Sequence, residues 1–157
     1  MTGLVFLLLG VMPAAEPVAG DGPDTVIVCP AEFREALRPW LDYRAGQGHS
    51  FAMVANTETS DGIRRRIREV AEGGDLRFVL LVGDADADAE QRRRCVPVHR
   101  AKAEVNVLWG SEPHIAADNW YADLDDDRTP DLAVGRLTAD SPDELRRIGR
   151  ASCRERV

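Results

Sequence analysis

Short apolar runs alternate with segments in which apolar residues recur at helical intervals. The runs that fit strands are residues 25–29, 50–56, 77–83 and 131–135. Between them lie segments such as 60–74, in which Ile63, Ile67 and Val70 share one helical face. Because strands and helices alternate over short connections, right-handed crossovers are expected. The pattern therefore predicts an α/β fold, a mostly parallel sheet flanked by helices.

The predicted helices carry their own boundary signals. Pro39 falls inside the first helical segment and should kink or restart it. Ser60 or Asp61 is expected to cap the second helix. Ser141 should cap a third, with Glu144 three residues later completing a capping box.

Residues 85–127 show no clean helical period, so they are predicted to form an excursion over the top of the sheet. Residues 96–100 and 105–109 are candidate short extended pieces within it. Ligands and catalytic groups gather at the carboxyl ends of parallel strands. Gly83 and Asp84 lie at one such end, where Asp84 either lines a site or only forms a turn.

The first residues have the composition of an export signal. The apolar run at 4–12 has the length of a signal-peptide core and is too short to span a membrane. No Lys or Arg precedes it, so a buried first strand or helix is the alternative. The prediction is a signal peptide over 1–19, cut near Ala15 or Ala19, a linker over 20–24, and a secreted or cell-envelope protein.

Composition narrows the possible partners. A chain of 157 residues with 44% hydrophobic content can bury one ordinary core. The net charge of -7 argues against a nucleic-acid surface, and the arginines at 64–68 are interpreted as helix solvation. Three cysteines, an odd number without a CxxC pair, argue against a disulfide framework. Cys29 fits a small buried hydrophobe, and Cys95 follows three arginines but has no evident base nearby.

The most acidic stretch, ADNWYADLDDDRTPDLAVGR at 117–136, combines aromatic residues with six aspartates. Asp123, Asp125 and Asp127 alternate as calcium ligands do in oxygen-rich loops. Arg128 occupies the place of the EF-hand glycine, so the loop is not an EF-hand. Structural calcium and a solvated turn both remain open, and no other cofactor is expected.

A series of landmarks carries a family resemblance. FVLLVGDAD, the Val96–Pro97 step, ADNWYADLDDD and TPDLAVGRLTADSPDEL follow one another in this order. The series resembles the gingipain family of secreted cysteine peptidases, relatives of the caspases. Residues 25–147 would then be the N-terminal part of the peptidase domain, and the substrates would be proteins or peptides.

The resemblance also assigns roles to individual residues. Asp118 and Tyr121, with Trp120, match the family's aromatic landmark and should pack the excursion onto the sheet. Arg136 closes the Gly-Arg strand and should pair with an aspartate of the acidic stretch or with Asp84. The implied catalytic residues are a Cys nucleophile and a His partner located downstream of this strand and its helix. The resemblance therefore predicts that this chain, as written, has no catalytic residues of its own and is inactive.

The histidines fit this expectation. His49, His99 and His114 are not followed by the glycine that the family's catalytic histidine precedes, so they are interpreted as ordinary surface or loop residues. Residues 148–157, including Cys153, resemble a translated sequencing adaptor and are set aside as an artefact, with a genuine basic helix end as the alternative.

Two other classes stay open. A flavodoxin-like receiver or nucleotide-binding module would use strand-end aspartates such as Asp84, Asp86 and Asp88, but it needs a lysine at a later strand end. Lys102 is the only lysine and is predicted to lie in the excursion. A non-catalytic α/β binding module is the second alternative.

Overall fold

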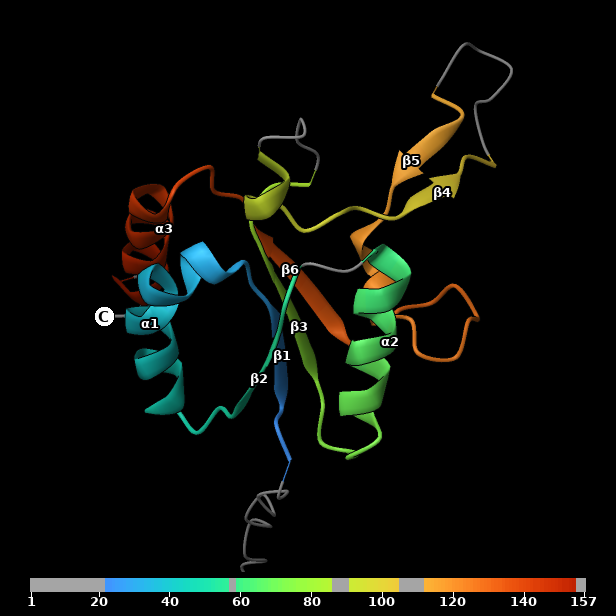
Figure 1. Cartoon of the computed structure of the whole chain (residues 1–157). Helices are drawn as coiled ribbons and strands as arrows, with labels where there is room; N and C mark the ends of the chain where they lie inside the picture. The colour runs from blue at the N-terminus through green and yellow to red at the C-terminus, as the bar shows by residue number, and fades with distance from the viewer. Residues whose placement is uncertain (1–21, 57–58, 86–90, 105–111, 155–157) are drawn as a thin grey trace, which may run out of the picture.

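A four-stranded parallel sheet forms the centre of the protein (Figure 1). The computed structural model describes residues 22–154 with gaps at 57–58, 86–90 and 105–111. The strands are β1 (Thr25–Val28), β2 (Phe51–Val54), β3 (Phe78–Val82) and β6 (Ala133–Leu137), in the order β2-β1-β3-β6. All three pairings are parallel, which confirms the predicted fold class. The predicted signal peptide lies outside the described residues.

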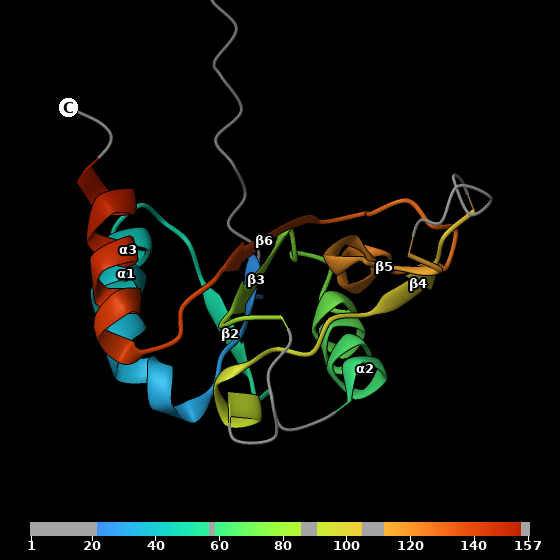
Figure 2. The ribbon, with the colours of Figure 1, turned by 90° about the horizontal axis from the view of Figure 1, so that it is seen from above.

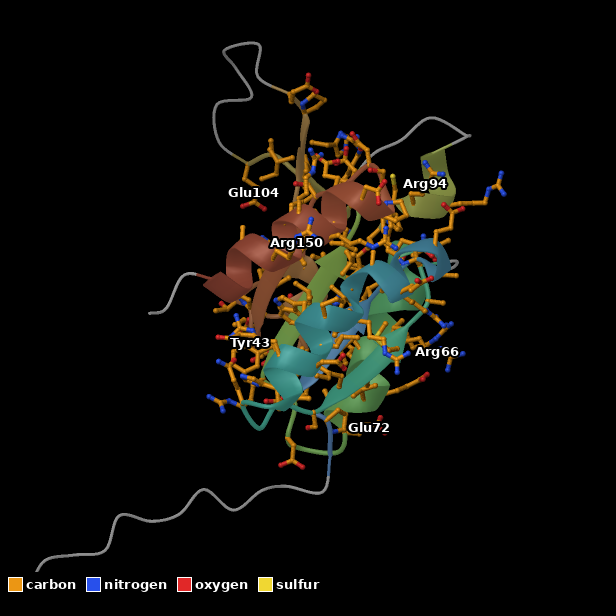
Figure 3. All side chains as sticks on the ribbon, turned by 90° about the vertical axis from the view of Figure 1, so that its left-hand side faces the viewer. Tyr43, Arg66, Glu72, Arg94, Glu104 and Arg150 are labelled. Carbon is orange, nitrogen blue, oxygen red and sulfur yellow. The ribbon has the colours of Figure 1, made fainter. Side chains whose placement is uncertain are left out.

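Helices cover both faces of the sheet. α1 (Arg34–Ala45) and α3 (Pro142–Arg154) lie side by side on one face, as Figures 2 and 3 show. α2 (Ser60–Ala71) and the 3-10 helix η4 (Asp118–Ala122) lie on the other. Two more 3-10 turns are η1 (Ala31–Phe33) and η2 (Gln91–Arg94). Within the described ranges, none of the helices has the length and apolar character needed to cross a bilayer.

The excursion after β3 contains a small second sheet. β4 (Arg100–Lys102) pairs antiparallel with β5 (His114–Ala116), and the pair projects from the main body (Figure 1). Of the two predicted extended pieces, 96–100 reaches only the first residue of β4, and 105–109 falls among the residues that are not described.

Alternation along the strands divides the core in two. Val26 and Val28 share a core cluster with Ile63 and Ile67 of α2, whereas Ile27 lies in the cluster on the α1 and α3 side. Successive strand side chains point to opposite faces, so a strand covered on both faces is apolar throughout. All four residues of β1 are buried, as expected for a central strand.

One predicted helix cap was wrong. Thr59, not Ser60 or Asp61, caps α2: its hydroxyl accepts a hydrogen bond from the Gly62 amide at 3.3 Å. Thr59 has extended backbone angles, which place its side chain over the first turn, while Ser60 and Asp61 are already helical. α1 continues through Pro39 as one helix, so the helix does not restart at that residue, and a kink there stays a prediction.

The third helix begins as predicted. The Ser141 hydroxyl accepts from the Glu144 amide at 3.3 Å, and the Glu144 carboxylate accepts from the Asp140 amide at 3.0 Å. The helix then continues past Arg147 to Arg154, and Ile148 packs against the core cluster shared with α1.

Candidate functional site at the carboxyl ends of the strands

Directly after β3, the chain passes so close to the backbone of Arg94 that position 83 requires glycine. Gly83 has φ of +113°, and a Cβ built there would lie 2.1 Å from the carbonyl oxygen of Arg94. The Gly83 amide donates to the Leu137 carbonyl at 2.8 Å, and the Val96 amide donates to the Asp84 carbonyl at 3.0 Å. The end of β3 is thereby joined both to β6 and to the returning excursion.

The Asp84 carboxylate makes a local contact: its Oδ1 accepts a hydrogen bond from the adjacent Ala85 amide at 2.6 Å. Both interpretations of Asp84, turn and site-lining residue, stay predictions. Asp86 and Asp88, which the nucleotide-binding alternative needs, lie outside the described residues.

Arg136, near the end of β6, contacts the end of β3, the excursion and η4. These segments around Arg136 are called the Arg136 corner below. Its Nε and Nη2 donate to the two carboxylate oxygens of Asp118 at 2.7 and 2.6 Å, a bidentate ion pair. Its Nη1 donates to the carbonyls of Gly83, Asp84 and Val96 at 3.2, 3.1 and 3.0 Å. The Arg136 side chain is only 9% exposed. The predicted pairing with an aspartate of the acidic stretch is present, and the contact with Asp84 is to its backbone.

Trp120 and Tyr121 attach η4 to the segments around it. Tyr121 is fully buried, its hydroxyl donates to the Pro97 carbonyl, and burial raises the pKa of its phenol. The Trp120 ring stacks on His99 with centroids 4.0 Å apart, and the Arg64 guanidinium lies 4.5 Å from its centroid. These contacts attach the excursion to the sheet, as expected for the landmark residues.

The acidic loop folds around the carboxylate of Asp123, a residue that is only 5% exposed. That carboxylate accepts from the amides of Asp126 and Arg128 at 2.7 and 3.2 Å. Both of these residues have positive φ, 67° and 72°, so the loop turns sharply at each of them. Arg64 lies 3.3 Å from the same carboxylate and 2.7 Å from that of Asp126.

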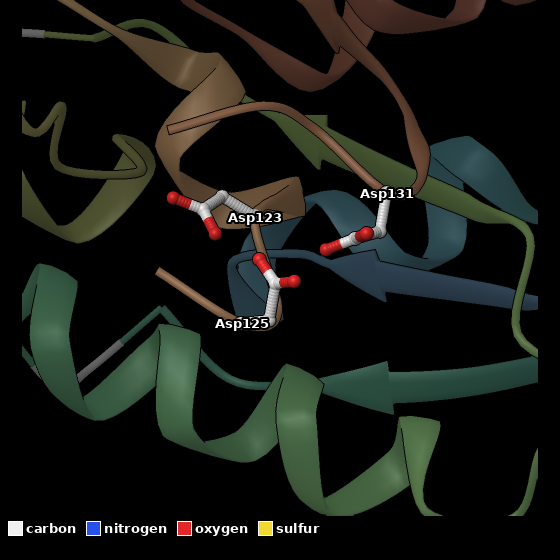
Figure 4. A group of neighbouring side chains, drawn as sticks. All are labelled: Asp123, Asp125 and Asp131. Atoms are coloured by element: carbon white, nitrogen blue, oxygen red, sulfur yellow. The ribbon is translucent and has the colours of Figure 1, made fainter. Parts of the chain in front are cut away.

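The loop brings together a different trio of carboxylates from the predicted one. Asp123, Asp125 and Asp131 have ligand oxygens within 4.8 Å of one another (Figure 4). Asp127 is not in this group, and its Oδ1 accepts from the Thr129 amide at 2.7 Å. Asp131 comes from the segment that leads into β6. The spacing of aspartates within the DLDDD run therefore does not reveal that Asp131 joins the group.

Arg64 is the residue of this region that sequence reasoning missed. Arg64 is 6% exposed and paired with the acidic loop, so the interpretation of this arginine as helix solvation is wrong. A buried carboxylate needs a compensating cation. The usable signal was the position of Arg64 between Ile63 and Ile67 on the inward side of α2.

Cys29 does not have the environment of a nucleophile. Cys29 and Cys95 are buried free thiols. Burial raises the pKa of Cys29 to about 11, and its thiol donates to the Pro30 carbonyl at 3.4 Å. A nucleophilic cysteine needs a thiolate, so Cys29 fits the predicted role of a small buried hydrophobe. The Cys153 side chain lies outside the described residues.

Two of the three histidines, His49 and His99, are held by side-chain contacts. His49 Nδ1 lies 2.7 Å from Asp24 Oδ2, at the amino end of the sheet. The His99 ring stacks on Trp120, and His114 begins the exposed strand β5.

Comparisons with known proteins identify the family. The sequence model of peptidase family C25 matches residues 19–150. Lys-gingipain from Porphyromonas gingivalis, with its 381 and W83 forms, is 26% identical over 133 residues, which is 78% of this chain and 7% of the relative. The chain thus spans less than a tenth of the length of these relatives.

Two solved structures share the fold. One, described as the structure of a protease, has a TM-score of 0.60 and 26% identity, covering 80% of this chain and 26% of the other. The second is a complex of the pro- and mature domains of RgpB from Porphyromonas gingivalis, with a TM-score of 0.59 and 20% identity over 78% of this chain and 26% of the other. The resemblance seen in the landmarks is confirmed, and the chain belongs to peptidase family C25, a family of cysteine peptidases.

Proposed function

We propose that this chain is the N-terminal part of the peptidase domain of a secreted, gingipain-like cysteine endopeptidase. The observation that carries the proposal is the family match over residues 19–150. Since the chain covers 26% of the solved relatives' chains, most of a relative's length has no counterpart here. The catalytic Cys/His dyad is placed in sequence that follows this part, and the substrates are proteins or peptides.

The described residues support this division of roles. Cys29 follows β1 and His49 precedes β2, and the two strands run parallel, so they lie at opposite ends of the sheet. Four strand residues separate those ends by about 13 Å. This is several times the hydrogen-bond distance that a nucleophile and its base require. The His99 ring is covered by Trp120 on one face.

The chain would contribute a rigid platform for the dyad. Cysteine peptidase chemistry needs a thiolate, an imidazole and amide donors held at strand ends. The Arg136–Asp118 pair ties β3, β6 and η4 together at that edge. Misplacement of reacting groups by about 1 Å can cost about a hundredfold in rate, so this corner would matter for activity through positioning.

A secretion assay tests activity and export together. The complete gene, expressed with its own leader in an exporting host, should yield extracellular protein that begins near residue 15 or 19. With reductant, it should cleave unfolded casein and be inactivated by iodoacetamide. The present chain should show no cleavage above a buffer control. Cleavage by this chain that disappears in Cys95→Ala would contradict the proposal, as would an inactive full-length protein.

The two alternatives gain no support from the described residues. Lys102 ends β4 in the two-stranded sheet, so the sequence's single lysine is not at a strand end of the main sheet. The Asp84 carboxylate is engaged by the Ala85 amide. A non-catalytic binding module differs from the peptidase only in the sequence beyond this chain, and the casein assay separates them.

Structural calcium remains a prediction, now with a testable ligand set. If calcium binds this loop, it should use Asp123, Asp125 and Asp131, whose oxygens already converge. Millimolar Ca²⁺ should then raise the melting temperature of the chain relative to EDTA. Asp131→Asn should abolish the increase, whereas Asp127→Asn should retain it. Equal melting temperatures with and without calcium would leave the solvated turn as the correct interpretation.

A further inference from the structure

The face of the sheet covered by α1 leaves a pocket toward the amino ends of the strands. Its volume is about 350 Å³, within the range of small-molecule sites. The first residue of each strand lines it: Thr25, Phe51, Phe78 and Ala133. Trp40 and Arg44 of α1 form the opposite wall.

Gly135 leaves the pocket open on the β6 side. A Cβ built on Gly135 meets no atom within 4 Å, whereas one on Gly83 would collide with backbone. Gly135 is not among the glycines with positive φ, so its backbone would accept other residues. Glycine weakens a strand interior, and here its effect is to keep space open beside Leu80 and Phe78.

Aromatic rings make up the apolar part of the pocket. The Trp40 and Phe51 rings are 6.1 Å apart and inclined at 45°, and Phe78 meets the His49 ring edge-on at 5.8 Å. A planar apolar group is well matched to such walls, because aromatic pairs favour tilted or edge-to-face contacts.

Arg44 gives the pocket a positive charge. Its guanidinium lies 5.5 Å from the Trp40 ring centroid, and its Nη1 donates to Gln47 at 3.1 Å. Its Nε is buried and has no hydrogen-bond partner among the described residues. A buried donor without an acceptor is destabilising, so an acceptor that reaches it would be stabilised there.

The remaining charges near the pocket leave Arg44 uncompensated. No Asp or Glu is among the described residues that line the pocket. The nearby Asp24 carboxylate is 2.7 Å from His49 Nδ1 and accepts from the Thr25 hydroxyl and the Ser50 amide. Asp24 is held by those partners, and among the described residues it forms no ion pair with Arg44.

We infer that this pocket binds a small carboxylate with an aromatic body, the ring between Trp40, Phe51 and Phe78 and the carboxylate on Arg44. The inference goes beyond the peptidase proposal and concerns a different edge of the sheet from the Arg136 corner. Charge complementarity selects this ligand class: an aromatic-walled pocket with one unpaired cationic donor and no lining carboxylate.

A binding titration on the whole chain tests the inference. The probe is 3-phenylpropanoate, followed by the amide NMR signals of Thr25 and Gly135. Saturable shifts with a dissociation constant below about 1 mM are expected for a ligand of this size. The neutral 3-phenylpropanamide should bind at least about tenfold more weakly, because one charge-assisted hydrogen bond is lost.

Three variants locate the binding. Gly135→Val should fill the pocket and abolish the shifts at Thr25 without lowering the melting temperature. Arg44→Met keeps the apolar stem and should weaken binding about tenfold, whereas Arg128→Met, at an exposed arginine elsewhere, should leave it unchanged.

Several outcomes would overturn the inference: no saturable shift, equal affinity for acid and amide, or unchanged binding in Gly135→Val. A chain that light scattering finds dimeric, and that Gly135→Val makes monomeric, would also do so, because a second copy would then occupy the pocket.

Discussion

Gly83→Ala should destabilise the chain by about 2–5 kcal/mol, the combined cost of a strained backbone and a forced overlap. The added Cβ would lie 2.1 Å from the Arg94 carbonyl oxygen, a backbone atom that cannot rotate away, and alanine disfavours φ of +113°. Urea unfolding followed by circular dichroism should show the loss as a lower midpoint.

Gly135→Ala is the matched control for this change. It introduces the same methyl group in the same sheet, but at a position with open space and without positive φ. Its unfolding midpoint should be unchanged or slightly higher, because alanine loses less backbone entropy than glycine on folding. Equal midpoints for Gly83→Ala and the parent would mean that Gly83 does not lie against the backbone of Arg94.

The parallel sheet was predictable because its signal is local. The strands are short and mainly apolar, and β1, covered on both faces, is buried at every position and apolar at all but Thr25. The cap at Ser141 was found for the same reason, since the capping residues are neighbours in sequence. The cap of α2 was missed by one residue, because Thr59, Ser60 and Asp61 are all good capping types and backbone conformation decides among them.

The chemistry of the corner was only partly predictable. Arg136 was expected to pair with an aspartate, but six aspartates in the 117–136 stretch compete for it, and sequence does not rank them. The burial of Arg64 and the convergence of Asp131 on Asp123 both depend on how the loop folds back on α2 and β6. Such contacts join residues far apart in sequence, so no periodicity reveals them.

Arg136→Met should cost about 2–4 kcal/mol of unfolding free energy, near the value for breaking a buried ion pair. Methionine fills much of the volume but removes both bonds to Asp118 and all three bonds to the Gly83, Asp84 and Val96 carbonyls. Asp118 is 29% exposed, so water can reach its carboxylate and the lower half of the range is expected. Urea unfolding measures the change.

Three further variants distinguish the effect of the bidentate Arg136–Asp118 contact from the effect of positive charge alone. Arg128→Met removes an arginine that is 81% exposed and paired with Glu104, and it should change stability by less than about 0.5 kcal/mol. Arg136→Lys keeps the charge but cannot form the planar fork, so it should fall between the parent and Arg136→Met. Asp118→Asn keeps the shape and one acceptor oxygen and should also be intermediate. If Arg136→Lys matches the parent, the corner depends on positive charge alone, and the bidentate geometry contributes nothing to holding β3, β6 and η4 together.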